Sequence, residues 1–152
     1  MPATIMPAKQ LRAADRKGGV MVETALVLPI ILVMVMGLFD HCRAIMVQQL
    51  VINAAREGAR QAIANTSTMT TANIQAVVTQ ALAGQRFSSV AISVYQVDPV
   101  TGNNLGAWNN TPAGSSIAVQ VNAHYTPMLS PFSLLPSSMA IEATSIMTSE
   151  AN

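Results

Sequence analysis

The longest apolar segment of the chain lies near its N-terminus. Fifteen consecutive residues, 25–39, carry no charge and no strongly polar group, and the stretch back to Gly19 adds only Glu23 and Thr24. A helix needs about 20 mainly apolar residues to cross a bilayer. Residues 19–41 are therefore predicted to form a transmembrane helix.

Helical periodicity continues beyond this segment. Apolar and small residues recur at helical spacing along one face. They are Val47, Leu50, Val51, Ala54, Gly58 and Ala62. Pro29 is the only helix-breaking residue between 20 and 64. One helix of about 67 Å is therefore predicted, and we expect Pro29 to kink its membrane half.

Small residues stand four positions apart in the outer part of this helix. The residues that form this small-residue surface are Ala54, Ala55, Gly58 and Ala59. Such spacing lets another backbone approach closely. The partner is either the chain's own sheet, which we favour, or the helix of a neighbouring subunit.

The periodicity changes after residue 65. Residues 65–68 break the helix, and 71–82 are predicted to form a shorter helix with Gly84 as its C-cap. Three segments then alternate with period two, as strands do when one face is apolar and the polar face meets water. The positions that share the apolar faces are Val90, Ile92 and Val94; Ile117, Val119, Val121, Ala123 and Tyr125; and Met139, Ile141, Ala143, Ser145 and Met147.

Two long segments connect these strands. Residues 98–115 are rich in Gly, Asn and Pro, and we interpret Trp108 within them as a packing anchor rather than an exposed contact residue. Pro127, Pro131 and Pro136 interrupt the second segment, which is apolar and which we expect to lie over the core.

These patterns predict an α+β fold in which a long N-terminal helix, its first half transmembrane, and a short helix pack on a small antiparallel sheet of about three strands. The expected parts are a basic cytoplasmic leader (1–18), the transmembrane helix (19–41), its extracytoplasmic continuation (42–65) and an extracytoplasmic α+β domain (66–152).

Charge is sparse and unevenly placed. Charged residues make up 10% of the chain, against about 25% in soluble domains. Residues 1–18 carry a net charge of +3 and residues 19–152 a net charge of −2. By the positive-inside rule the N-terminus stays cytoplasmic and the C-terminal domain lies outside. Arg56 and Arg60 are too few for a nucleic-acid footprint.

The sequence contains no recognisable catalytic or metal-binding motif. One cysteine, Cys42, excludes an internal disulfide, and we expect it to be a small packing residue. His41 and His124 are isolated, so no zinc cluster is predicted. No phosphate loop and no nucleophile motif is present. We therefore expect neither an enzyme nor a cofactor.

Three interpretations of residues 1–43 compete. A cleaved secretory signal has an apolar core of about 7 to 15 residues, shorter than this one. A plain signal anchor explains the hydrophobicity but not the order of residues before it. A prepilin-type site would be cut after Gly18, which leaves the membrane helix in the product. Gly19 would then carry the new amine, and Glu23 would lie one turn further on the same face.

Two motifs resemble one known family. The stretch RKGGVMVETALVLP, from Arg16 to Pro29, and the stretch NAAREGAR, from Asn53 to Arg60, resemble the two signatures of TadE-like pseudopilins. Thr24 departs from the aromatic residue frequent in the family after the glutamate. Asp40 with His41 replaces a Glu-aromatic pair at the end of the membrane segment.

The resemblance implies a pilin-like fold and a role in pilus assembly. It implies cleavage by a prepilin peptidase between Gly18 and Gly19, and a role for Glu23 in subunit registration or processing. The anchor and assembly helix would include Val20, Ala25, Leu26, Leu28, Pro29 and Phe39. Implied partners are other pseudopilins and the major Flp pilin, an inner-membrane assembly platform and membrane lipid. Because the outer domain is much larger than that of the short Flp pilin, a minor or accessory role in a Tad-type pilus or secretion system follows.

Overall fold

A computed structural model describes residues 11–127 and 137–149 of the chain. Its elements are the helices α1 (Leu11–Ala64) and α2 (Thr71–Ala81) and the strands β1 (Phe87–Val97), β2 (Asn104–Gly106), β3 (Ser116–Tyr125) and β4 (Met139–Thr148). The α+β class with a long N-terminal helix is confirmed. Most of the apolar segment expected to lie over the core falls at 128–136, outside the described residues.

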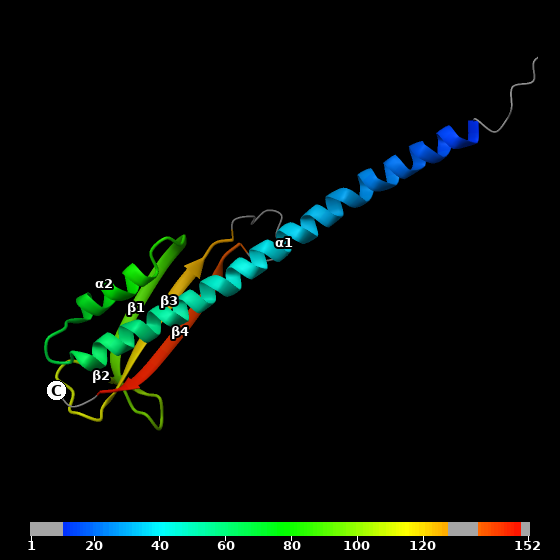
Figure 1. Ribbon diagram of the computed structural model, residues 1–152. Coiled ribbons are helices and arrows are strands. Elements are labelled where there is room, and N and C mark those ends of the chain that lie inside the picture. The colour runs from blue at the N-terminus through cyan, green and yellow to red at the C-terminus, as the bar shows by residue number, and fades with distance from the viewer. Residues whose placement is uncertain (1–10, 128–136, 150–152) are drawn as a thin grey trace, which may run out of the picture.

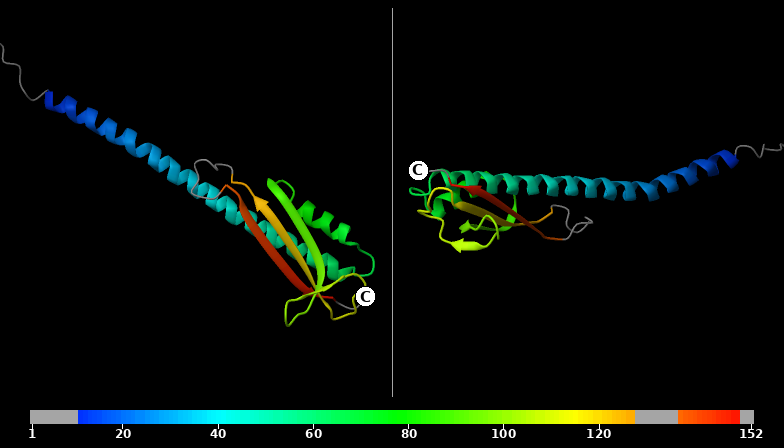
Figure 2. Two further views of the ribbon diagram at one scale, coloured as in Figure 1. Left: turned by 180° about the vertical axis from the view of Figure 1, so that it is seen from behind. Right: turned by 90° about the horizontal axis from the view of Figure 1, so that it is seen from below.

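Helix α1 is longer than predicted. It begins at Leu11, so the second half of the basic leader is already helical, and it ends at Ala64 as expected. The N–H groups of Thr68 and Met69 donate to the carbonyl of Asn65 and close the turn that follows. The helix extends far beyond the sheet (Figure 1) and bends within its blue N-terminal part (Figure 2). Pro29 is the proline inside it, and the bend agrees with the predicted kink.

The outer part of α1 packs on β3 and β4, and α2 packs beside it over β1. The small-residue surface of α1 is buried in this contact. A Cβ added to Gly58 would lie 2.6 Å from Cγ2 of Val78 in α2 and 3.3 Å from Cγ1 of Val119 in β3. The partner is therefore the chain's own sheet, as we favoured, together with α2.

Helix α2 starts and stops at polar and glycine signals. The Thr70 side chain is the N-cap and accepts from the N–H of Asn73. Ile74 and Val78 form its buried face. The C-cap is Leu82 rather than the predicted Gly84, which follows two residues later with a φ of +89°. Glycine is favoured there because it adopts positive φ without strain.

The sheet has four strands in the order β2-β1-β3-β4, all antiparallel, instead of about three. The additional strand β2 lies inside the predicted loop 98–115 and pairs with β1 only at Gln96 and Val97. Three residues with a glycine among them show no alternation, so this strand gave no sequence signal. The turn before it is held by the Asp98 carboxylate, which accepts from the Val100 N–H and the Thr101 hydroxyl. These bonds lower the pKa of Asp98.

The outer face of the sheet is less open to water than predicted. Ala118 in β3 is fully buried, although it alternates with the core positions. In register with it stand Tyr95 of β1 and Ile146 of β4, on the same face. Two large side chains thus flank a small one, which shields it from solvent. Trp108 is 1% exposed, so its interpretation as a packing anchor is confirmed.

Candidate processing site and assembly helix

The predicted cleavage site lies in the free part of α1. Gly18 and Gly19 are both helical and exposed, and a Cβ added to either would have no heavy atom within 4 Å. Two glycines in succession lower the local stability of a helix by about 1 kcal/mol each relative to alanine. The peptide bond between them is therefore both accessible and comparatively easy to unwind.

Glu23 lies one helical turn beyond Gly19. Its side chain is exposed, and with Val20, Thr24, Val27, Leu28 and Ile31 it lines a shallow groove on the helix surface. The Thr24 hydroxyl donates to the Val20 carbonyl at 2.9 Å, which pairs that polar group within the helix. The carboxylate is thus the polar group of this groove most in need of a partner in an apolar medium.

The apolar half of α1 has no contact with the sheet. Its large apolar side chains between Val20 and Phe39 are 42–73% exposed. A continuous exposed surface of this kind marks contact with lipid or with another protein. The helix Gly18–Ala64 has the length and composition to cross a membrane. The predicted anchor residues Ala25, Leu26, Leu28 and Pro29 all lie on this exposed surface.

The end of the apolar segment differs from expectation at one residue. Cys42 is exposed and does not pack in the core. Ala44 and Val47 are the buried positions of this part of α1. Residue 42 lies about 200° around the helix from residue 44, on the side turned away from the sheet. Periodicity alone does not show which side of helix α1 the sheet covers.

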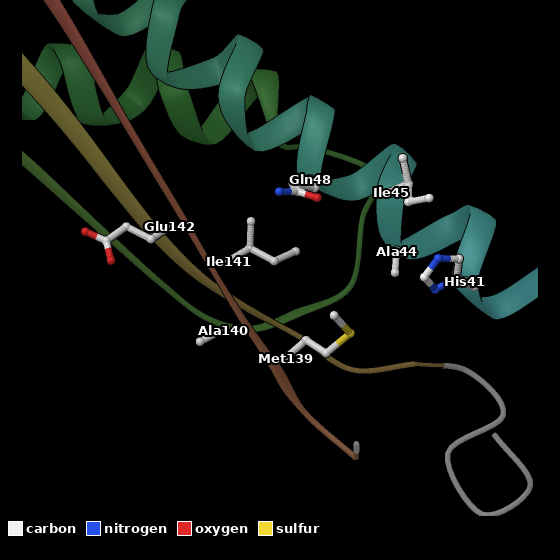
Figure 3. Close-up of a pocket in the computed structure, with 8 residues that line it drawn as sticks. All are labelled: His41, Ala44, Ile45, Gln48, Met139, Ala140, Ile141 and Glu142. Carbon is white, nitrogen blue, oxygen red and sulfur yellow. The ribbon is translucent and has the colours of Figure 1, made fainter. Parts of the chain in front are cut away.

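A groove of about 210 Å³ lies where α1 meets the first residues of β4. Figure 3 shows His41, Ala44, Ile45 and Gln48 on the helix side, with Met139 and Ile141 pointing toward them from the strand and Glu142 pointing away. The helix positions follow an i, i+3, i+4, i+7 pattern that the sequence displays. The strand that completes the groove lies some ninety residues later, and only the fold reveals it.

Two further contacts could not be predicted from the sequence. The Trp108 indole N–H donates to the Thr71 hydroxyl at 2.9 Å, which ties the long loop to the start of α2. The Gln75 amide donates to the Ile92 carbonyl at 3.0 Å and links α2 to β1. Both join residues distant in sequence.

The charged residues of the second motif form a local cluster. The Arg60 guanidinium lies 3.1 Å from the Glu57 carboxylate, and Gln61 donates to the same carboxylate. The bond from Gln61, and then the bond from Arg60, lowers the pKa of Glu57. Within the described part of the chain, no group of three or more His, Cys, Asp or Glu residues is placed to hold a metal ion.

Residues 18–60 match the family described as TadE-like protein. This segment is TadE-like. The match covers the exposed glycines, Glu23, the apolar helix and the whole small-residue surface, and it confirms the resemblance seen in the two motifs. Comparison with curated proteins and with solved structures gives no match.

The match links the segment 18–60 to a family associated with the Tad pilus system, at the level of the family. The apolar helix near the N-terminus, together with this match, indicates a membrane-anchored protein.

Proposed function

We propose that this chain is a TadE-like pseudopilin, a minor or accessory subunit in the assembly of a Tad-type (Flp, type IVb) pilus or secretion system. The observation that carries the proposal is the order along α1: accessible Gly18 and Gly19, then Glu23, then an apolar surface that the sheet leaves uncovered. A cut on the cytoplasmic side of that surface yields a product that keeps its membrane helix.

In the proposed mechanism a prepilin peptidase cleaves after Gly18. The amine of Gly19 and the carboxylate of Glu23 then lie one turn apart and neutralise each other within one chain or between staggered chains. An unpaired charge in the bilayer core costs about 2.5–3.5 kcal/mol on insertion scales, which favours such pairing. The subunit would remain in the inner membrane with its sheet outside, in contact with other pseudopilins, the major Flp pilin and an assembly platform.

Co-expression with the cognate prepilin peptidase tests the cleavage step. We expect the intact mass and the N-terminal sequence of the membrane-bound product to show a chain that starts at Gly19. Gly18→Leu should block the cut, because a bulky side chain replaces the small residue before the scissile bond. Gly37→Leu, at a second open glycine of α1, is the matched control and should be processed normally.

Two results would contradict the cleavage proposal. A soluble product that starts near Leu38 would identify a secretory signal. An uncut chain that stays in the membrane would favour the alternative function, a single-pass anchored binding domain. The groove beside Ile45 and Met139 is the observation that gives this alternative a physical basis.

The role of Glu23 is tested separately. We expect Glu23→Val to leave the chain in the membrane, since the substitution makes α1 more apolar, and to reduce pilus production because the pairing charge is lost. Shed and cell-bound pili would be quantified in a strain that carries the variant as its only copy. Normal piliation would rule out the registration role, and Glu57→Val, outside the apolar segment, serves as control.

A further inference from the structure

Among the described residues, the strand β4 forms an edge of the sheet with no strand paired to it. It is ten residues long, it pairs with β3 without a bulge, and it contains no proline and one charged residue, Glu142. Within the described residues, no backbone hydrogen bond is made to the free edge of β4, on the side away from β3. Proteins normally protect long edge strands with charges, prolines, bulges or a covering segment. An edge with so few of these features is suited to pair with another strand.

The opposite edge of the sheet, β1, is protected over only part of its length. Strand β2 pairs with Gln96 and Val97. The Gln75 side-chain amide donates a hydrogen bond to the carbonyl of Ile92 on the same edge. Among the described residues, no strand pairs with the free edge of residues 87–91, which has one register shift between Phe87 and Ser89. Within that part of the chain, both edges are therefore unpaired at the strand beginnings.

The two open edges have complementary side chains on the helix side of the sheet. Beside β4 lies the groove of about 210 Å³ between α1 and residues 139–142. Along the opposite edge, Val90 is 40% exposed. It stands in register with the core residues Ala123 and Ile141, so it points to the helix side. An apolar side chain on one edge thus has an apolar groove at the corresponding place on the other.

The charges near these edges are also opposite. Arg86 directly precedes β1 and is exposed, and Glu142 is exposed on the outer face of β4. Because β1 and β4 are both antiparallel to β3, they run parallel to each other and begin at the same end of the sheet. Arg86 and Glu142 therefore lie at the same end of the molecule, on opposite lateral sides.

The direction of the strands agrees with anchoring in one membrane. A second copy displaced sideways without rotation brings its β1 beside β4, in parallel, and keeps both α1 helices pointing the same way. An antiparallel pairing of β4 with β4 about a two-fold axis would point the two apolar helices in opposite directions. Sideways displacement lets both apolar helices enter one membrane from the same side, and the two-fold arrangement does not.

We propose that a second copy of this chain occupies the β4 edge, with residues 87–91 of one copy paired in parallel with residues 139–142 of the next and Val90 seated in the groove. The interface is head-to-tail, so it repeats into open rows of subunits in the plane of the membrane. The proposal uses the membrane anchoring but not the processing step, so an uncleaved chain would associate in the same way.

Cysteine cross-linking in membranes tests this arrangement. In full-length Cys42→Ser chains with two different tags, one chain carries Ile45→Cys, in the groove, and the other Val90→Cys. Both positions are exposed, so the fold should be retained. A short bismaleimide should give a product with both tags only on co-expression, several-fold above the control pair of Asn53→Cys, exposed elsewhere on α1, with Val90→Cys.

Charge reversal provides a second measurement in the same membranes. Glu142→Arg in the Ile45→Cys chain should reduce the cross-linked product about two-fold, because the residue lies on the same edge as Arg86 of the neighbour, about four positions along the paired strands, and their attraction becomes repulsion. Arg86→Glu in the partner chain should restore the product. Glu57→Arg, a matched reversal away from the edge, should leave it unchanged. The proposal is overturned if the product does not exceed the control pair, if Glu142→Arg has no effect, or if the Ile45→Cys chain alone cross-links equally well.

Discussion

At the scale of single residues, Gly58 decides how closely the outer part of α1 approaches the rest of the domain. Its backbone lies against Val78 and Val119, and any side chain there would overlap the first of these. Val78 is β-branched, so it has little freedom to move away. Glycine therefore serves here for lack of a side chain, although it is a poor helix former.

We expect Gly58→Ala to destabilise the outer domain by about 1 kcal/mol. Overpacking costs about 1–3 kcal/mol, and the better helix propensity of alanine returns up to about 1 kcal/mol. Thermal unfolding of the detergent-solubilised chain, followed by circular dichroism, measures the difference. In a Val78→Ala background the same change should be neutral or stabilising, because the clashing methyl is gone.

Gly37→Ala is the matched control for this substitution, since an added Cβ would meet no heavy atom within 4 Å. It should leave the unfolding of the outer domain unchanged. A Gly58→Ala chain as stable as the original would show that α1 and α2 adjust their separation without cost, contrary to the packing described.

At the scale of helices and strands, predictability followed the strength of the local pattern. The turn at 65–68, the start of α2 and three strands came directly from periodicity and capping residues. Strand β2 did not, because three residues without alternation carry no signal. The groove beside β4 did not either, because its two sides combine His41 and Ala44 with Met139 and Ile141, and no local rule relates them.

In the candidate site, too, some features follow from the local sequence and others depend on the fold. Gly18, Gly19 and Glu23 are recognised by their order in one helix, which the sequence shows directly. The exposure of Cys42 and the burial of Ala118 depend instead on which elements pack above them. Such contacts are set by the tertiary arrangement, so the expectation for Cys42 was wrong and the burial of Ala118 could not be predicted.

The N-cap of α2 gives a prediction at this scale. Thr70→Ala should destabilise the outer domain by about 0.5–2 kcal/mol, because the N–H of Asn73 loses its side-chain acceptor. Thr68→Ala, at an exposed residue of the preceding turn, should have little effect. Chemical denaturation of both variants in detergent compares them, and equal midpoints would show that the cap does not contribute.

At the scale of the whole molecule, α1 connects two environments without a break. Its apolar half stands free and its outer half forms one layer of the α+β domain (Figure 1). Cys42 lies at the junction, exposed and just beyond the apolar run. This position makes the native cysteine a natural reporter of membrane orientation.

We expect Cys42 to react with a membrane-impermeant maleimide added to intact spheroplasts, because the domain that follows it would lie outside. In a Cys42→Ser background, Leu32→Cys should not react, since lipid surrounds it. In cells without the prepilin peptidase, where residues 1–18 stay on the chain, Lys9→Cys should react only after permeabilisation. Labelling of the native cysteine only in permeabilised cells would reverse the proposed orientation.

The unbroken course of α1 has a mechanical consequence. No flexible linker separates the apolar half of the helix from the half that packs on the sheet, so the outer domain cannot move independently along the helix axis. If the helix is drawn outward by one turn, the whole domain rises with it by about 5.4 Å. The helix and the domain would move as one rigid body. A force applied to the domain would therefore act directly on the helix that holds it in the membrane.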